Sequence, residues 1–355
     1  MHWMQNLPSP SALNFAGSSY GNGNAFCLRG PSELSGREAT QLKMWDLETA
    51  CHNACLLEGS VQGALGELWF HQSRLRNVGN RCNRHDALQR ARGYLISRLE
   101  NAGKEVADDE IAWLHTWLNR VLDAQNDWVA CRSWAEKCIA RGVLWEHPYQ
   151  RPGHFVPGLK SQPWHCASHF ELCWRLESSY ESIKAELLAL LGISWGRVGE
   201  RATHDGGLIS AGEWHEVVLL GDSEECFANR QRCPATSTAL ASRPEAVECA
   251  RLGVGEALFS LLKPRTKLRT HCGPTNIRLT CHLGLIIPEG CHITAGDQAP
   301  RTWKEGKCLV FDDSFEHSVE NNSDQNRIIL LVNFWHPGIS PTEWPARASR
   351  ASGTA

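Results

Sequence analysis

The chain has 355 residues, of which 42% are hydrophobic and 21% charged, and its formal net charge is −3. This composition is typical of a globular protein with room for a large core, and it predicts no nucleic-acid or membrane-surface partner. No apolar run approaches the ~20 residues of a membrane-spanning helix, and the first residues lack the pattern of a signal peptide. We therefore expect a soluble, cytoplasmic chain, or one in the endoplasmic reticulum if a targeting segment is missing from the sequence.

The 15 cysteines are too dilute for a disulfide framework. Most of them are expected to be small buried apolar side chains in a reducing environment. Two pairs at helical spacing, Cys51 with Cys55 and Cys131 with Cys138, leave a zinc site open as a minor alternative. No CxxC knuckle, the usual sign of structural zinc, occurs in the chain.

Residues 1–36 are rich in Gly, Ser, Asn and Pro, which predicts a disordered leader. Residues 37–143 are expected to be helical, with Asp108 or Asp109 as a cap and Gly142 as a stop. Paired helices of this size are interpreted as degenerate tetratricopeptide-like repeats or as an ordinary bundle, since no clean period is visible. The apolar residues at helical spacing are Leu42, Trp45, Cys51, Ala54 and Cys55, then Ala87, Ala91, Leu95 and Leu99, then Ile111, Leu114, Leu118, Val121 and Leu122, and finally the run Trp128–Ile139.

Residues 144–181 contain many prolines and are expected to form an extended segment, followed by one helix with Leu176, Tyr180, Ile183, Leu187 and Leu190 on one face. From about Val198 onward, short strand-like runs alternate with turns, which indicates a β-barrel or jelly roll. The clearest runs are Trp214–Leu220, Ala257–Leu262, Ile277–Ile287, Lys307–Phe311, His317–Glu320 and Arg327–Trp335. The fold class predicted is thus α+β, a helical region followed by a β domain.

One predicted strand, Asn276–Leu285, carries an unusual polar face. Because side chains alternate along a strand, Arg278, Thr280 and His282 point one way and the apolar residues point the other way. An unpaired charge inside a barrel is costly, so this face is expected to meet water or a polar ligand.

Two further residues suggest a site at the same place. His317 opens a strand after an acidic turn, and Arg327 begins the next strand, where a guanidinium suits carboxylate recognition. Imidazole suits iron, zinc and copper, so the region is a candidate metal site. The alternative is that His271, His282 and His317 are separate residues facing solvent.

Several ordered motifs resemble the aspartyl/asparaginyl β-hydroxylase domain, and the resemblance runs from about 144 to 340. It divides the chain into a leader (1–36), a helical region (37–143), a β-hydroxylase-like domain (144–345) and a tail (346–355). The motifs are PYQR at 148–151, PGLK at 157–160, QPW at 162–164, GEW at 212–214, HCGPTNIRL at 271–279, HLGLIIP at 282–288, WKEGK at 303–307, FDDSFEH at 311–317 and WHP at 335–337.

This resemblance implies a double-stranded β-helix that binds Fe(II), 2-oxoglutarate and O2. His271 and His317 match the two iron ligands. Gly273 stands where other enzymes of this chemistry have a carboxylate, and the family leaves that position to water. The residues that match contacts to 2-oxoglutarate are Arg327 for the distal carboxylate, Ser260 assisting it, and His282 for the carboxylate nearer the metal.

Thr280 departs from the family pattern, which has an arginine there. We expect Arg278, on the same face, to replace that cation, or the affinity for 2-oxoglutarate to be reduced. Asp313 matches a position near the substrate, or is a turn aspartate. Cys226 and Cys233 resemble a disulfide pair of secretory-pathway members, although two thiols in a loop are an equal expectation.

The resemblance implies hydroxylation of an aspartyl or asparaginyl side chain in a protein or peptide, with release of succinate and CO2. Alternatives are hydroxylation of a lipid acyl chain or another small substrate, halogenation through chloride at the third ligand position, and a catalytically weakened module for protein interaction.

Overall fold

The computed structural model describes residues 63, 65–67, 69–71, 84–198, 207–221 and 224–353. The leader predicted at 1–36 and the apolar stripe from Leu42 to Cys55 lie outside these residues. The chain divides into two compact units, Met1–Asp127 and Trp128–Ala355, which are described separately. Within the described residues, none of the helices combines the length and apolar character needed to cross a membrane.

In the first unit, α3 (Arg84–Glu100) packs against α4 (Asp108–Ala124). The helical stripes expected there are confirmed, because their apolar residues, apart from the half-buried Leu99, lie in the interface. The expected cap is wrong: α4 begins at Asp108 itself, and Ala107 precedes it without a side-chain cap. The three acidic residues in its first turn, Asp108, Asp109 and Glu110, instead complement the positive end of the helix dipole.

The second unit begins with α5 (Trp128–Arg141), a helix that the sequence pattern grouped with the preceding ones. Gly142 follows it with φ +72°, as expected for a glycine that ends a helix. An extended segment then runs along the β domain up to β1 (Trp164–His165). It stays extended because its prolines exclude helix, and its carbonyl groups pair with loops of the β domain.

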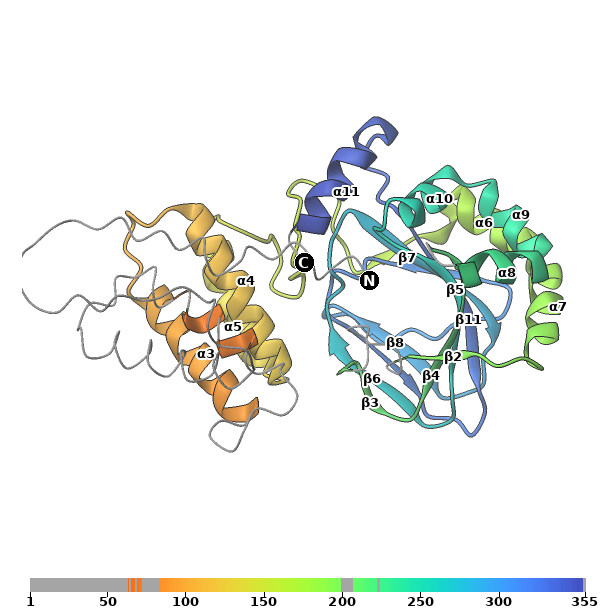
Figure 1. Cartoon of the computed structure of the whole chain (residues 1–355), viewed down its shortest axis with the longest axis horizontal. Coiled ribbons are helices and arrows are strands. Elements are labelled where there is room, and N and C mark those ends of the chain that lie inside the picture. The colour runs from red at the N-terminus through yellow and green to blue at the C-terminus, as the bar shows by residue number, and fades with distance from the viewer. Residues whose placement is uncertain are drawn as a thin grey trace, which may run out of the picture. The chain divides into compact units, whose positions relative to one another are not determined.

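The β domain consists of a seven-stranded and a four-stranded antiparallel sheet, in the orders β1-β9-β7-β11-β5-β4-β2 and β3-β6-β10-β8 (Figure 1). The remaining strands are β2 (Gly196–Arg197), β3 (Ile209–Ala211), β4 (Trp214–Leu220), β5 (Ala257–Leu262), β6 (Thr266–His271), β7 (Arg278–Ile286), β8 (Cys291–Ala295), β9 (Cys308–Phe311), β10 (His317–Asn321) and β11 (Arg327–Trp335). The helices are η3 (Ala167–His169), α6 (Glu171–Ser178), α7 (Tyr180–Leu190), α8 (Glu224–Arg232), α9 (Pro234–Ala241), α10 (Pro244–Arg251), η5 (Pro341–Glu343) and α11 (Trp344–Gly353).

Two apolar cores flank the larger sheet. The outer core lies between this sheet and helices α6, α7, α9 and α10, which gather along one side of it in Figure 1. The inner core lies between the two sheets and includes Phe311 and Ile329 from the larger sheet and Leu268 and Ile293 from the smaller one. Two facing antiparallel sheets of this kind form a jelly roll, which confirms the predicted fold class.

All six predicted strands occur, and three have the expected bounds. The sequence pattern missed β6 and β8, and it missed the three short helices α8–α10 between β4 and β5. The single helix expected before them is two helices, α6 and α7, which meet at Ser179. The segment treated as a tail lies mostly in α11, which packs on β11 through stacked Trp344 and Trp335.

Candidate metal centre

His271 and His317 lie opposite each other on neighbouring strands of the smaller sheet. The antiparallel register pairs His271, the last residue of β6, with His317, the first residue of β10. Directly opposite residues project from the same face of a sheet, and the two ring centroids are 4.1 Å apart. The structure therefore brings together two imidazoles that are far apart in the sequence.

Both imidazoles are held in the same way by the backbone. Nδ1 of His271 lies 2.9 Å from the carbonyl oxygen of Arg269, and Nδ1 of His317 lies 2.9 Å from that of Phe315. Because a carbonyl only accepts, each Nδ1 carries the proton and each Nε2 presents a lone pair. Burial lowers the pKa of both rings, and electrostatic repulsion from His317 lowers the pKa of His271 further. Neutral imidazoles oriented by a second hydrogen bond are suited to bind a metal ion.

Gly273 lies against Asp313 beside the histidine pair. Its N–H donates a 2.6 Å hydrogen bond to the Asp313 carbonyl oxygen. A Cβ on Gly273 would lie 2.8 Å from both Cγ and Oδ2 of Asp313. Real Cβ atoms do not make contacts this short, so a side chain at 273 would displace Asp313. The space beside the first histidine is thus filled from another loop.

Asp313 forms a partly buried ion pair with Arg278. The Arg278 guanidinium donates a 2.7 Å hydrogen bond to Asp313 Oδ2 and another to the carbonyl oxygen of Val254. Asp313 Oδ1 is buried and has no hydrogen-bond partner within the described part of the chain. Since Asp313 already balances the charge of Arg278, this arginine is less suited to a cosubstrate carboxylate than the sequence suggested.

Arg327 is a buried cation among the described residues whose Nε and Nη1 lack hydrogen-bond partners. Its guanidinium lies over the Trp303 ring, 4.9 Å from the centroid. Burial lowers the pKa of Arg327 to about 10, which still leaves it charged at neutral pH. An unpaired buried guanidinium is costly unless an anion joins it, so this side chain is prepared for a carboxylate.

Ser260 and His282 share the face of the larger sheet on which Arg327 lies. Ser260 pairs with Ile329 and His282 pairs with Leu331, and both partners are an even number of residues from Arg327. His282 Nδ1 accepts a 3.2 Å hydrogen bond from Trp303, so its Nε2 carries the proton. That N–H is buried without a partner in the described structure and can donate to an anion.

Thr280 lies on the same face and is engaged by a neighbour. Its hydroxyl accepts a 2.9 Å hydrogen bond from the Asn333 amide, whose oxygen accepts from the N–H of Glu256. Position 280 therefore carries a neutral side chain that is already hydrogen-bonded. Arg327 faces the inner core without a second cation at this position.

Comparison with known proteins shows which family this region resembles. Residues 177–337 match the family described as aspartyl/asparaginyl beta-hydroxylase. The chain is 37% identical over 199 residues to the human (Homo sapiens) protein named aspartyl/asparaginyl beta-hydroxylase, covering 55% of this chain and 25% of that protein. Residues 177–337 are thus similar to an aspartyl/asparaginyl β-hydroxylase domain.

Two further proteins illustrate how far the similarity extends. Human aspartate beta-hydroxylase domain-containing protein 1 is 36% identical over 203 residues, which cover 55% of this chain and 50% of that protein. The chain thus spans between a quarter and half of these two relatives. The match to a solved prolyl-4-hydroxylase of Pseudomonas putida has 16% identity and a TM-score of 0.28, and it covers 46% of this chain and 88% of that one.

Residues to which the sequence pattern assigned no role hold the turn that precedes His317. Glu316 is buried and receives hydrogen bonds from Arg151, in the proline-rich segment, and from Arg132 in α5. Gln150 donates to Asp312 and Ser314 in the same turn. Of the sequence motifs, only PYQR at 148–151 indicated a role in holding this turn, because it contains both Gln150 and Arg151.

The structure also shows where two cysteine pairs named from the sequence lie in the second unit. Cys226 lies in α8, Cys233 is the single residue between α8 and α9, and no disulfide joins them. Cys131 and Cys138 are buried on α5. No group of metal-ligating residues in the described ranges includes either of those two; the one group found consists of Cys173, Cys281 and Cys308.

Proposed function

We propose that the β-hydroxylase-like domain is an Fe(II)- and 2-oxoglutarate-dependent oxygenase in which His271 and His317 hold the metal. The observation that carries the proposal is the pair of facing imidazoles whose Nδ1 atoms are both tied to backbone carbonyls. This arrangement leaves two Nε2 lone pairs for one ion. Imidazole nitrogen with oxygen donors is a ligand set that iron accepts.

The residues around the pair fit an iron site with two protein ligands. Gly273 has no room for a carboxylate, because Asp313 fills that space. The remaining positions on the metal are then left to water and cosubstrate. Asp313 is assigned a role next to the metal but not as a ligand. Its unpartnered Oδ1 can accept a hydrogen bond from a water or a substrate group beside the metal.

The inner face of the larger sheet supplies a site for a dicarboxylate such as 2-oxoglutarate. Arg327 would pair with the distal carboxylate, assisted by the Ser260 hydroxyl, and the His282 Nε2–H would donate to the carboxylate nearer the metal. Each of these groups is buried, which strengthens a charge-assisted hydrogen bond and excludes bulk water. Arg278 is assigned a supporting role, since it fixes Asp313.

Bound iron would supply the activation of O2, coupled to conversion of 2-oxoglutarate into succinate and CO2, for insertion of one oxygen atom into a substrate C–H bond. The protein would orient the reactants and keep water out of the inner core. The substrate we propose is an aspartyl or asparaginyl side chain of a protein or peptide. The family match and the names of the relatives support this choice.

Turnover of labelled 2-oxoglutarate tests the proposal. Purified protein with Fe(II), ascorbate and candidate Asp- or Asn-containing peptides should form succinate and hydroxylated peptide, while His271→Ala and His317→Ala should form neither. His292→Ala, a histidine of β8 outside the pair, is the matched control and should retain activity. Equal turnover by wild type and both site variants would refute the metal assignment. Failure to bind or convert 2-oxoglutarate would instead favour a module for protein interaction.

A further inference from the structure

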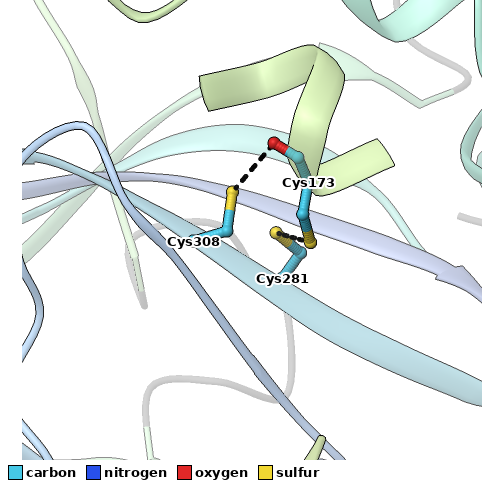
Figure 2. Close-up of side chains that lie close together, drawn as sticks. All are labelled: Cys173, Cys281 and Cys308. Carbon is cyan, nitrogen blue, oxygen red and sulfur yellow. Dashed lines mark hydrogen bonds between the residues drawn. The ribbon is translucent and has the colours of Figure 1, made fainter. Parts of the chain in front are cut away.

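Three cysteines that are far apart in the sequence meet on the outer side of the larger sheet. Cys173 comes from α6, Cys281 from β7 and Cys308 from β9, and their sulfur atoms all lie within 4.8 Å of one another (Figure 2). Cys173 and Cys281 are fully buried, and Cys308 is half-buried at the edge of the group. We refer to these three residues as the thiol cluster.

The sheet register explains why the thiol cluster forms on this side. Cys281 lies between Thr280 and His282, so its side chain projects from the opposite face, toward the helices. Cys308 pairs with Leu283 on the neighbouring strand, two residues from Cys281 and on the same face. Helix α6 packs over both strands, and its Cys173 carbonyl accepts a 3.7 Å hydrogen bond from the Cys308 thiol.

The spacing of the sulfur atoms suits a shared metal ion. Cys173 Sγ and Cys281 Sγ are 3.7 Å apart. Ligands about 2.3 Å from a tetrahedral zinc ion lie about 3.8 Å from one another, whereas a disulfide requires about 2.05 Å. The pair would need little movement to bind one ion, but would have to close by more than an ångström to form a disulfide.

The cation nearest in sequence to the thiol cluster is engaged elsewhere. Lys307, the residue before Cys308, forms an ion pair with Glu177 at the surface. A metal ion bound by the three sulfur atoms would itself supply the positive charge that stabilises them as thiolates.

We propose that Cys173, Cys281 and Cys308 form a second metal site, which binds one thiophilic ion such as Zn(II) or Cu(I). Thiolate sulfur selects ions of this class over Mg(II) or Ca(II). Binding of a divalent ion to three thiols forms three metal–sulfur bonds and releases three protons to solvent. The half-buried Cys308 marks the side from which the ion enters. This site is independent of the histidine pair, which lies on the other sheet.

Titration with Cd(II) tests the proposal, because a cadmium–thiolate bond has an ultraviolet charge-transfer band that histidine ligation lacks. The experiment uses reduced, metal-free full chain, both as wild type and with His271→Ala and His317→Ala together. Both proteins should bind one equivalent of Cd(II) with this band. Cys308→Ser should weaken binding at least 100-fold, and the double variant Cys173→Ser/Cys281→Ser should abolish it. Cys233→Ser, which changes a buried cysteine outside the cluster, should bind as wild type does.

Alkylation mapping keeps the test decisive if a buried variant does not fold. In wild type, saturating Zn(II) should slow alkylation of Cys308 at least tenfold and leave the exposed Cys166 unchanged. Competition between Zn(II) and Cu(I) then identifies the preferred ion. Absence of the charge-transfer band in folded wild type, equal binding by wild type and Cys308→Ser, or equal protection of both cysteines would overturn the proposal. The three thiols would then be small apolar residues of the outer core.

Discussion

Gly273 and Asp313 are in direct contact, with a 2.6 Å hydrogen bond between their backbones and no space between them for a Cβ atom. A methyl group at 273 must therefore displace the Asp313 carboxyl and the loop that leads to His317. We expect Gly273→Ala to weaken Fe(II) binding 10- to 100-fold, the range seen when groups around metal ligands are lost. Equilibrium titration of Fe(II) under anaerobic conditions measures this change.

Gly192→Ala is the matched control for Gly273→Ala, because a Cβ at 192 meets nothing within 4 Å. Gly273→Asp is expected to weaken Fe(II) binding as well, since its larger side chain meets the same obstruction. Tighter binding by Gly273→Asp would show that the site accepts a third protein ligand after all.

Arg327→Gln is expected to reduce affinity for 2-oxoglutarate. Hydrogen bonds to charged groups contribute about 1.5–3 kcal/mol, which corresponds to a dissociation constant raised roughly 10- to 150-fold. Isothermal titration with 2-oxoglutarate measures the effect, and Arg301→Gln, an arginine over the Trp164 ring, is the control. Unchanged affinity in Arg327→Gln would mean that another group holds the distal carboxylate.

Arg151 and Glu316 form a fully buried ion pair in the turn before His317. Arg151→Met leaves the buried Glu316 carboxylate with Arg132 as its remaining cation, so it is expected to destabilise the second unit by about 3 kcal/mol, the lower end of the cost of breaking a buried pair. Arg132→Met removes a partner that is a third exposed and should cost at most about 1 kcal/mol. Urea denaturation compares the two variants, and equal losses would contradict this ranking.

Asp312 should make stability depend on pH. Burial raises its pKa to about 7, against the opposing hydrogen bonds from Ser314 and Gln150. Between about pH 4 and pH 7, Asp312 is protonated in the folded chain and deprotonated in the unfolded chain. The free energy of unfolding that depends on Asp312 therefore decreases as pH rises. The free energy of unfolding of wild type relative to Asp312→Asn should fall across that window, by at most about 1.4 kcal/mol per pH unit. A constant difference would show that Asp312 stays charged.

The strands were the part of the fold most accessible from sequence. Apolar β-branched runs such as Arg327–Trp335 and the alternation of Arg278, Thr280 and His282 appear directly in the residue order. Strand β6 was missed because Thr266–His271 contains two threonines and three basic side chains but only one apolar residue. It is a strand because β10 and β3 pair with it. Pairing of this kind is a tertiary property that no local pattern records.

The site was predicted as a set of residues, whereas its contacts were not. Nothing in the sequence indicates that Asp313 would fill the space beside Gly273, or that Asn333 would engage Thr280. The thiol cluster escaped sequence analysis for the same reason, since its members come from a helix and two strands that meet only in the folded chain. Short spacings such as CxxC reveal metal sites within one loop, and sites assembled across a sheet leave no such signal.

The most direct test of the two-histidine iron centre is the visible absorption band that arises when 2-oxoglutarate chelates Fe(II), recorded without O2 and without any substrate. Wild type should develop this band with one equivalent of Fe(II), and His271→Ala and His317→Ala should not. Arg327→Gln should develop it only at higher concentrations of 2-oxoglutarate. A band of equal intensity and affinity in wild type and in both histidine variants would contradict the account.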